Sequence, residues 1–95
     1  MALSDARLKR GVARIDAPLA RLRRITGYTY DGVGRRHAGV LAQDVLGALP
    51  EAVQEARDGH GRMAVDYSAL TALIVEALRE LRAKAAAAGL LTPAS

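Results

Sequence analysis

The strongest structural signal in the chain is a helical pattern that runs from Tyr67 to Ala88. Apolar residues recur there at three- and four-residue steps, as one face of an α-helix requires. Asp66 precedes the pattern as a typical N-cap residue, and Gly89 follows it as a typical C-terminal stop. The apolar side consists of Leu70, Leu73, Ile74, Ala77, Leu78, Leu81, Ala85 and Ala88, and the polar side of Glu76, Arg79, Glu80, Arg82 and Lys84. The pattern predicts one long amphipathic helix.

The apolar side of this helix is compatible with two arrangements. The helix can pack on its own domain, or it can supply one strand of a three-stranded seam between copies of the chain. Two sets of residues have the seven-residue spacing of such a seam: Leu70, Ala77 and Lys84, and Ile74, Leu81 and Ala88. Three heptads leave both arrangements open. A 95-residue domain buries little surface, which favours support from partners.

The rest of the chain predicts short elements of both kinds, so the fold class is α+β. Ser4 can N-cap a short helix over Asp5–Gly11, and Pro18 can open a second over Leu19–Arg24. The β-branched and aromatic content of residues 25–30 predicts a strand, and turn residues at 31–34 lead into a partner strand over 35–40.

A central short helix is predicted over residues 41–49. Its apolar side carries Leu41, Val45, Leu46 and Leu49, and it ends before Pro50. A second turn at residues 58–61 precedes a brief strand at 63–65. Short N-terminal helices, a small hairpin, this central helix and the long C-terminal helix make up the expected architecture.

Composition excludes several kinds of chain. There is no cysteine, so no disulfide framework and no thiolate metal site is expected. No apolar run approaches the length of a membrane span, and charged residues interrupt the start of the chain where a signal peptide would be apolar. His37 and His60 lie far apart without a third ligand, so no metal and no cofactor is expected.

The charge is concentrated at the front of the chain. Nine of the 14 Lys and Arg residues lie within residues 1–36, against three of the 10 Asp and Glu residues. This asymmetry can indicate a nucleic-acid surface. However, the basic residues alternate with apolar ones, and no aromatic residues lie among those of residues 7–24 to stack on bases. A solvated basic face is the better interpretation, and no specific nucleic-acid partner is expected.

A possible catalytic pair lies close to the N-terminus, at Ser4 and Lys9. In a serine–lysine dyad a neutral amine takes the hydroxyl proton and the serine oxygen attacks a carbonyl. Side chains five residues apart diverge in a continuous helix or strand. The two therefore meet only if Ser4 lies at or before a helix start and Lys9 curls back. A lysine ordinarily titrates near pH 10.4, so the base would also need burial or neighbouring cations such as Arg7 and Arg10.

Four blocks of sequence resemble one family in the same order. Ser4 to Lys9 reads S-D-A-R-L-K, and Gly39 to Val45 reads G-V-L-A-Q-D-V, with Asp44 where the family usually has Glu. Leu49 to Val53 reads L-P-E-A-V, and Val65 to Leu70 reads V-D-Y-S-A-L. Together they resemble the intramolecular chaperone auto-processing domain, a self-cleaving serine peptidase found at the C-termini of phage tailspikes, endosialidases and tail fibres.

The resemblance implies a function and a set of residues. A homotrimer would template the folding of an upstream fibre polypeptide and then release itself by cutting the Leu3–Ser4 bond. Ser4 would be the nucleophile and Lys9 the general base. The residues that share the motifs, and so would support the site, are Asp5, Arg7, Leu8, Gln43 and Asp44. The trimer seam would include Leu70, Ile74, Ala77 and Leu81.

The same resemblance divides the chain. Residues 4–89 would form the chaperone domain, residues 1–3 the end of an upstream fibre or an added start, and residues 90–95 a tail. The expected location is the host cytoplasm during phage assembly. Two alternatives stay open from the residues themselves: a non-catalytic trimeric assembly module, and a small basic nucleic-acid-binding protein.

Overall fold

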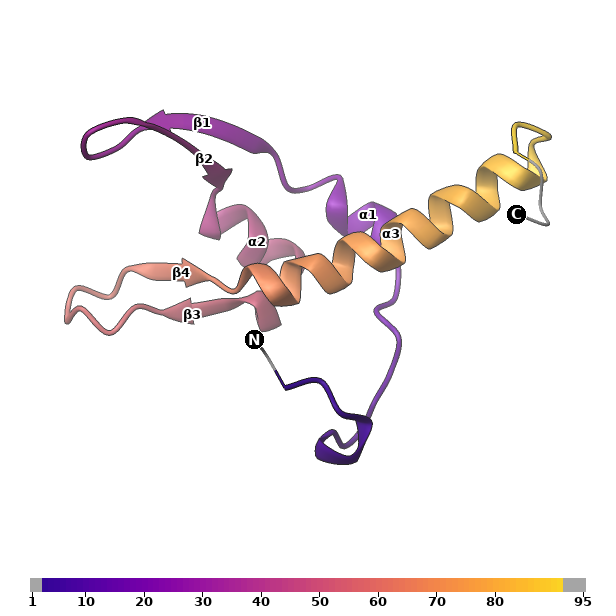
Figure 1. Ribbon diagram of the computed structural model, residues 1–95, viewed down its shortest axis with the longest axis horizontal. Helices are drawn as coiled ribbons and strands as arrows, with labels where there is room; N and C mark the ends of the chain where they lie inside the picture. Colours follow the sequence, from indigo (N-terminus) through magenta and orange to yellow (C-terminus); the bar gives the residue numbers. More distant parts are fainter. Residues whose placement is uncertain (1–2, 92–95) are drawn as a thin grey trace.

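The computed structural model describes residues 3–91. Within that range the elements are, in chain order, the 3-10 turn η1 (Ala6–Leu8), α1 (Pro18–Leu22), β1 (Gly27–Asp31), β2 (Arg36–Val40), α2 (Ala42–Ala48), the 3-10 turn η2 (Pro50–Ala52), β3 (Val53–Glu55), β4 (Met63–Val65) and α3 (Tyr67–Ala87). The strands form two antiparallel hairpins, β1 with β2 and β3 with β4. The predicted α+β class, with a long C-terminal helix, is confirmed (Figure 1).

Both ends of α3 follow from local chemistry. The Asp66 carboxylate accepts hydrogen bonds from the backbone N–H groups of Ser68 and Ala69, at 3.0 and 3.2 Å. These donors have no partner inside the helix, so the cap stabilises its first turn. At the other end Gly89 adopts a left-handed φ of +78°, which glycine tolerates without strain. The predicted cap and stop are confirmed, with the helix ending one residue earlier than expected.

The core lies where α2 and η2 pack against the first half of α3. Its buried cluster contains Val45, Leu49, Ala52, Leu70 and Leu73. The prediction that Leu41 and Leu46 share the apolar side of α2 is wrong, since they are 47% and 46% exposed. Leu41 precedes the helix in an extended conformation, and Leu46 is turned about 100° from its buried neighbour.

The two hairpins were predicted unequally well. β1 and β2 pair from Gly27 with Val40 to Asp31 with Arg36, which confirms the predicted hairpin with its first strand starting two residues later. Of the second hairpin only the strand at 63–65 was expected, and its partner Val53–Glu55 was missed. Three residues that follow a proline-led turn carry too little alternation to indicate a strand.

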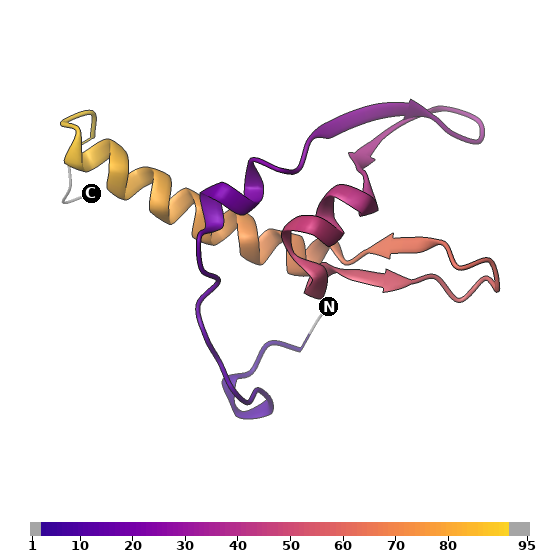
Figure 2. The same ribbon diagram turned by 180° about the vertical axis from the view of Figure 1, so that it is seen from behind.

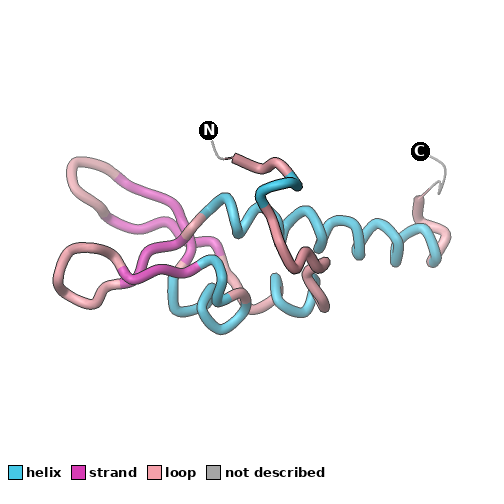
Figure 3. The backbone as a smooth tube through the Cα atoms, turned by 90° about the horizontal axis from the view of Figure 1, so that it is seen from below, coloured by secondary structure: helices cyan, strands magenta, loops and turns pink. Residues whose placement is uncertain are grey.

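The molecule is open rather than rounded. Its Cα radius of gyration is 16.3 Å, where a compact domain of this length would have about 12 Å. Both hairpins project to one side and the last turns of α3 to the other (Figures 1 and 2). In the view from below, α3 runs well beyond the other elements (Figure 3). No helix among residues 3–91 is both long enough and apolar enough to cross a bilayer.

Candidate active site

The N-terminal segment of residues 3–14, here called the arm, is exposed along its whole length. It leaves the body just before α1 and projects away from it (Figures 1 and 2). Leu3, Leu8 and Val12 are 84%, 66% and 77% exposed. Their own chain therefore leaves three apolar side chains of the arm uncovered.

The predicted short helix over Asp5–Gly11 is wrong, and so is the predicted cap. The segment forms a single 3-10 turn, η1, and Asp5 rather than Ser4 caps it by accepting a hydrogen bond from the Arg7 N–H at 2.9 Å. An aspartate carboxylate that bonds the backbone two residues on closes a local turn and competes with a longer helix. The chain becomes extended again at Lys9.

This turn brings Ser4 and Lys9 together. The Lys9 backbone N–H donates to the Ala6 carbonyl at 3.1 Å, and the Lys9 Nζ lies 3.2 Å from the Ser4 Oγ. Ser4 lies before the start of the turn and Lys9 reaches back to it, as their five-residue spacing requires. In this contact the amine donates to the hydroxyl, so a base role requires the amine to lose a proton first.

Asp5 and Arg7 form a second pair, with more hydrogen bonds, beside Ser4 and Lys9. The Arg7 Nε and Nη2 reach the two Asp5 carboxylate oxygens at 2.7 to 3.2 Å. Hydrogen bonds from Arg7 lower the pKa of Asp5, and the same carboxylate raises the pKa of the Arg7 guanidinium. The Arg7 charge is thus offset by Asp5. Leu8, the remaining motif residue of the arm, is exposed.

The remaining motif residues lie on the body rather than on the arm. Gln43 is exposed and Asp44 half-buried, both in the first turn of α2. Neither caps that helix through its side chain, because Leu41 is the N-cap residue. Gln43 lines an open groove of about 570 Å³ between the two hairpins. Ser4 and Lys9 line neither that groove nor the one of about 550 Å³ beside α3.

The predicted trimer seam divides into two groups. Leu70 and Ala77 are buried in the core of the single chain, at 5% and 1% exposure, which removes them from any surface available to another copy. Ile74 and Leu81 are 39% and 52% exposed. Leu78, at 59%, lies between them at four- and three-residue steps. Val75 is also exposed, at 52%. The set Ile74, Leu78 and Leu81, which repeats at three- and four-residue steps, is here called the uncovered apolar face of α3.

One contact at the root of the arm was not anticipated from the sequence. Arg14 donates from Nε to the Glu76 Oε1 at 2.9 Å, across 62 residues of chain. Arg14 mainly, through this hydrogen bond, lowers the pKa of Glu76. The helical pattern placed Glu76 only on the polar side of its helix, and no local signal names a partner so distant. No three His, Cys, Asp or Glu side chains gather as a metal site among residues 3–91.

Comparison with known proteins identifies the family. The family model described as chaperone of endosialidase matches residues 4–54, which contain Ser4 and Lys9, the first hairpin, α2 and the start of β3. The chain belongs to the chaperone of endosialidase family. The resemblance drawn from the four sequence blocks is confirmed.

Relatives of this family member include long tail fibre proteins. The "Long tail fiber protein Gp37" of Enterobacteria phage K3 is 36% identical over 90 residues, which is 85% of this chain and 7% of that protein. The protein of the same name from Enterobacteria phage M1 is 34% identical over 88 residues, 82% of this chain and 35% of that protein. The chain thus corresponds to a minor part of these much longer fibre proteins.

Proposed function

We propose that this chain is the chaperone domain of a phage tail fibre, which acts as a homotrimer and releases itself by one self-cleavage at the Leu3–Ser4 bond. Membership of the chaperone of endosialidase family and similarity to long tail fibre proteins support the chaperone role. The single observation that carries the cleavage is the 3.2 Å approach of the Lys9 Nζ to the Ser4 Oγ at the start of the family match. The work would take place in the host cytoplasm during phage assembly.

The proposed chemistry uses the serine against its own preceding carbonyl. A neutral Lys9 amine takes the proton of the Ser4 hydroxyl while Oγ bonds to the Leu3 carbonyl carbon. Lys9 then gives this proton to the Ser4 nitrogen as the C–N bond breaks, so that the nitrogen leaves as a neutral amine and Lys9 is neutral again. Water hydrolyses the resulting ester between Leu3 and the Ser4 Oγ. The upstream chain keeps the Leu3 carboxylate, and Ser4 becomes a free N-terminus.

Assembly would switch this chemistry on. Both side chains are exposed in one chain, where water stabilises the ammonium form of a lysine. Cover from a second copy would remove that water and favour the neutral amine. The open shape and the uncovered face Ile74, Leu78 and Leu81 support association between copies of the chain. Ile74 and Leu81 have the seven-residue spacing of a helical seam.

The deciding experiment is a fusion that carries a fibre segment before Leu3, analysed by mass spectrometry of the intact products. We expect the parent to split and to leave Ser4 as the new N-terminus. Ser4→Ala should abolish the cut because it removes the attacking oxygen. Lys9→Arg should abolish it as well, because a guanidinium stays protonated and cannot act as a base.

The same fusions separate this proposal from its alternative. The exposure of the dyad favours one second candidate, a trimeric assembly module that carries the motif without cleaving. A parent fusion that trimerises and stays intact would establish that candidate. Cleavage at the same bond in Ser4→Ala would refute the nucleophile. No specific nucleic-acid binding is expected, and sequence-dependent nanomolar affinity at about 150 mM salt would contradict that.

A further inference from the structure

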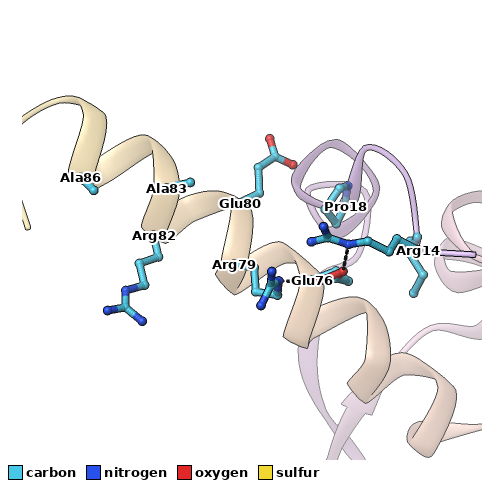
Figure 4. Close-up of a pocket in the computed structure, with 9 residues that line it drawn as sticks. Arg14, Pro18, Glu76, Arg79, Glu80, Arg82, Ala83 and Ala86 are labelled. Carbon is cyan, nitrogen blue, oxygen red and sulfur yellow. Dashed lines mark hydrogen bonds and ion pairs between the residues drawn. The ribbon is translucent and has the colours of Figure 1, made fainter. Parts of the chain in front are cut away.

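The arm joins the body through one carboxylate on α3. Glu76 receives the Arg14 Nε at Oε1, 2.9 Å away, and its Oε2 lies 3.1 Å from the Arg79 Nε on the next turn of the same helix. Figure 4 shows the two guanidinium groups converging on Glu76 from the arm and from α3. Ile15, next in the chain, packs against the core cluster. The exposed arm therefore ends at the contact between Arg14 and Glu76, here called the junction.

Glu76 differs from an ordinary surface glutamate in its burial. Its side chain is 16% exposed, and Oε2 is buried without a hydrogen bond from any group in residues 3–91. A carboxylate withdrawn from water in this way depends on nearby positive charge. One turn further on, Glu80 accepts the backbone N–H of Leu19 at 3.2 Å and also pairs with Lys84. Successive acidic residues of α3 thus hold the segment that leads from the arm into α1.

The junction links two parts of the molecule that the proposed function needs to act together. Glu76 lies two residues from Ile74 and two from Leu78, on the helix whose uncovered face would bind other copies. Arg14 lies five residues from Lys9 on the arm. A fixed arm root limits the volume that Ser4 and Lys9 can sample relative to α3, and hence relative to a copy bound there.

We infer that Glu76 is a positioning residue, which anchors the arm through Arg14 so that assembly on α3 places the Ser4–Lys9 pair for cleavage. The inference rests on the proposed self-cleavage. Arg14 and Arg79 make a matched pair for testing it. Both are exposed arginines that pair with the Glu76 carboxylate. Arg14 belongs to the arm, whereas Arg79 lies on α3 itself.

The experiment uses the fibre fusion and compares Arg14→Ala, Arg79→Ala and Arg14→Lys. We expect Arg14→Ala to slow self-cleavage roughly tenfold, because the reacting groups lose their fixed placement. Arg79→Ala should cleave at the parent rate, and Arg14→Lys should recover part of the loss by keeping the charge. Backbone order parameters measured by NMR on the same variants in the uncleaved Ser4→Ala background report the arm directly. The order parameters of residues 10–17 should fall in Arg14→Ala and stay unchanged in Arg79→Ala.

Each outcome addresses either the anchor or the chemistry. If the order parameters of residues 10–17 in Arg14→Ala equal those of the parent, or if Arg14→Ala frees the arm without slowing cleavage, the positioning role is refuted while self-cleavage stands. Equal slowing by Arg14→Ala and Arg79→Ala would also refute it, because general loss of helix charge would then explain the effect. A parent fusion that never cleaves defeats the proposed function instead.

Discussion

Two apolar stripes run along α3, and they have opposite environments. The inner stripe, Leu70, Leu73 and Ala77, is 0–5% exposed, and its two leucines pack in the core cluster with residues of α2 and η2. The outer stripe, Ile74, Leu78 and Leu81, is 39–59% exposed and faces away from the core. Both stripes repeat at three- and four-residue steps and lie about a quarter turn apart around the helix.

The difference indicates that one helix serves two purposes. The inner stripe stabilises the single domain, whereas the outer stripe offers an apolar surface that the domain itself leaves uncovered. A contiguous exposed apolar surface on a small domain is typical of an interaction site.

The same substitution in each stripe should have different consequences. Leu73→Asp should unfold the domain, because a charge at a site with 0% exposure has no partner and no water. Even Leu73→Ala at such a site costs about 2–5 kcal/mol, a large part of the total stability of a small domain. Circular dichroism should show loss of helix at all temperatures. A cooperative thermal unfolding transition in Leu73→Asp would contradict the assignment of Leu73 to the buried inner stripe.

Leu81→Asp should keep the fold and lose the assembly. Leu81 is half exposed in the single chain, so a carboxylate there remains in water until copies associate. In a seam it would be buried and unpaired, which is strongly unfavourable. Sedimentation equilibrium at micromolar concentration should give a trimer for the parent and a folded monomer for the variant. A parent that is monomeric throughout this range would refute the role of the outer stripe.

Removing the cap of α3 should affect both stripes equally but modestly. Asp66→Ala leaves the N–H groups of Ser68 and Ala69 without their acceptor, which costs about 1 kcal/mol. The melting temperature should fall, while the trimer persists below it. Asp66→Asn is the control, because its side-chain oxygen can still accept these bonds. A lower melting temperature for Asp66→Asn than for Asp66→Ala would contradict the capping role.

The smallest effect concerns the polar side of α3, which holds the arm and α1. Arg14 lowers the pKa of Glu76, and Lys84 together with the Leu19 N–H lowers that of Glu80, both below the usual value of 4.5. The unfolded chain therefore binds more protons, so these groups stabilise the fold above about pH 4.5 and lose this effect as pH falls further. Between pH 6 and pH 3 the melting temperature should fall less steeply in Glu76→Gln than in the parent. If the melting temperature falls equally with pH in both proteins, Glu76 does not contribute to the pH dependence of stability.

Local chemistry explains the elements that could be predicted from the sequence. Asp66 and Gly89 fix the ends of α3 through contacts within a few residues. The first hairpin follows from two short strands and the turn between them. The meeting of Ser4 and Lys9 follows from their spacing around one turn, although Asp5 closes that turn instead of Ser4. The family followed from four ordered blocks, since a fixed order is far rarer than any one motif.

Other features depend on contacts between distant segments, which only the tertiary structure decided. A three- and four-residue pattern cannot tell Leu73 from Leu78, because the covering surface comes from α2 and η2, more than 20 residues earlier. The strand Val53–Glu55 exists because Met63–Val65 pairs with it. The Arg14–Glu76 anchor joins residues 62 apart. The sequence by itself determined where α3 begins and ends and that Ser4 and Lys9 meet across one turn, because neighbours in the chain supply those forces. The tertiary structure decided which apolar faces are covered, because burial is a property of the packed chain.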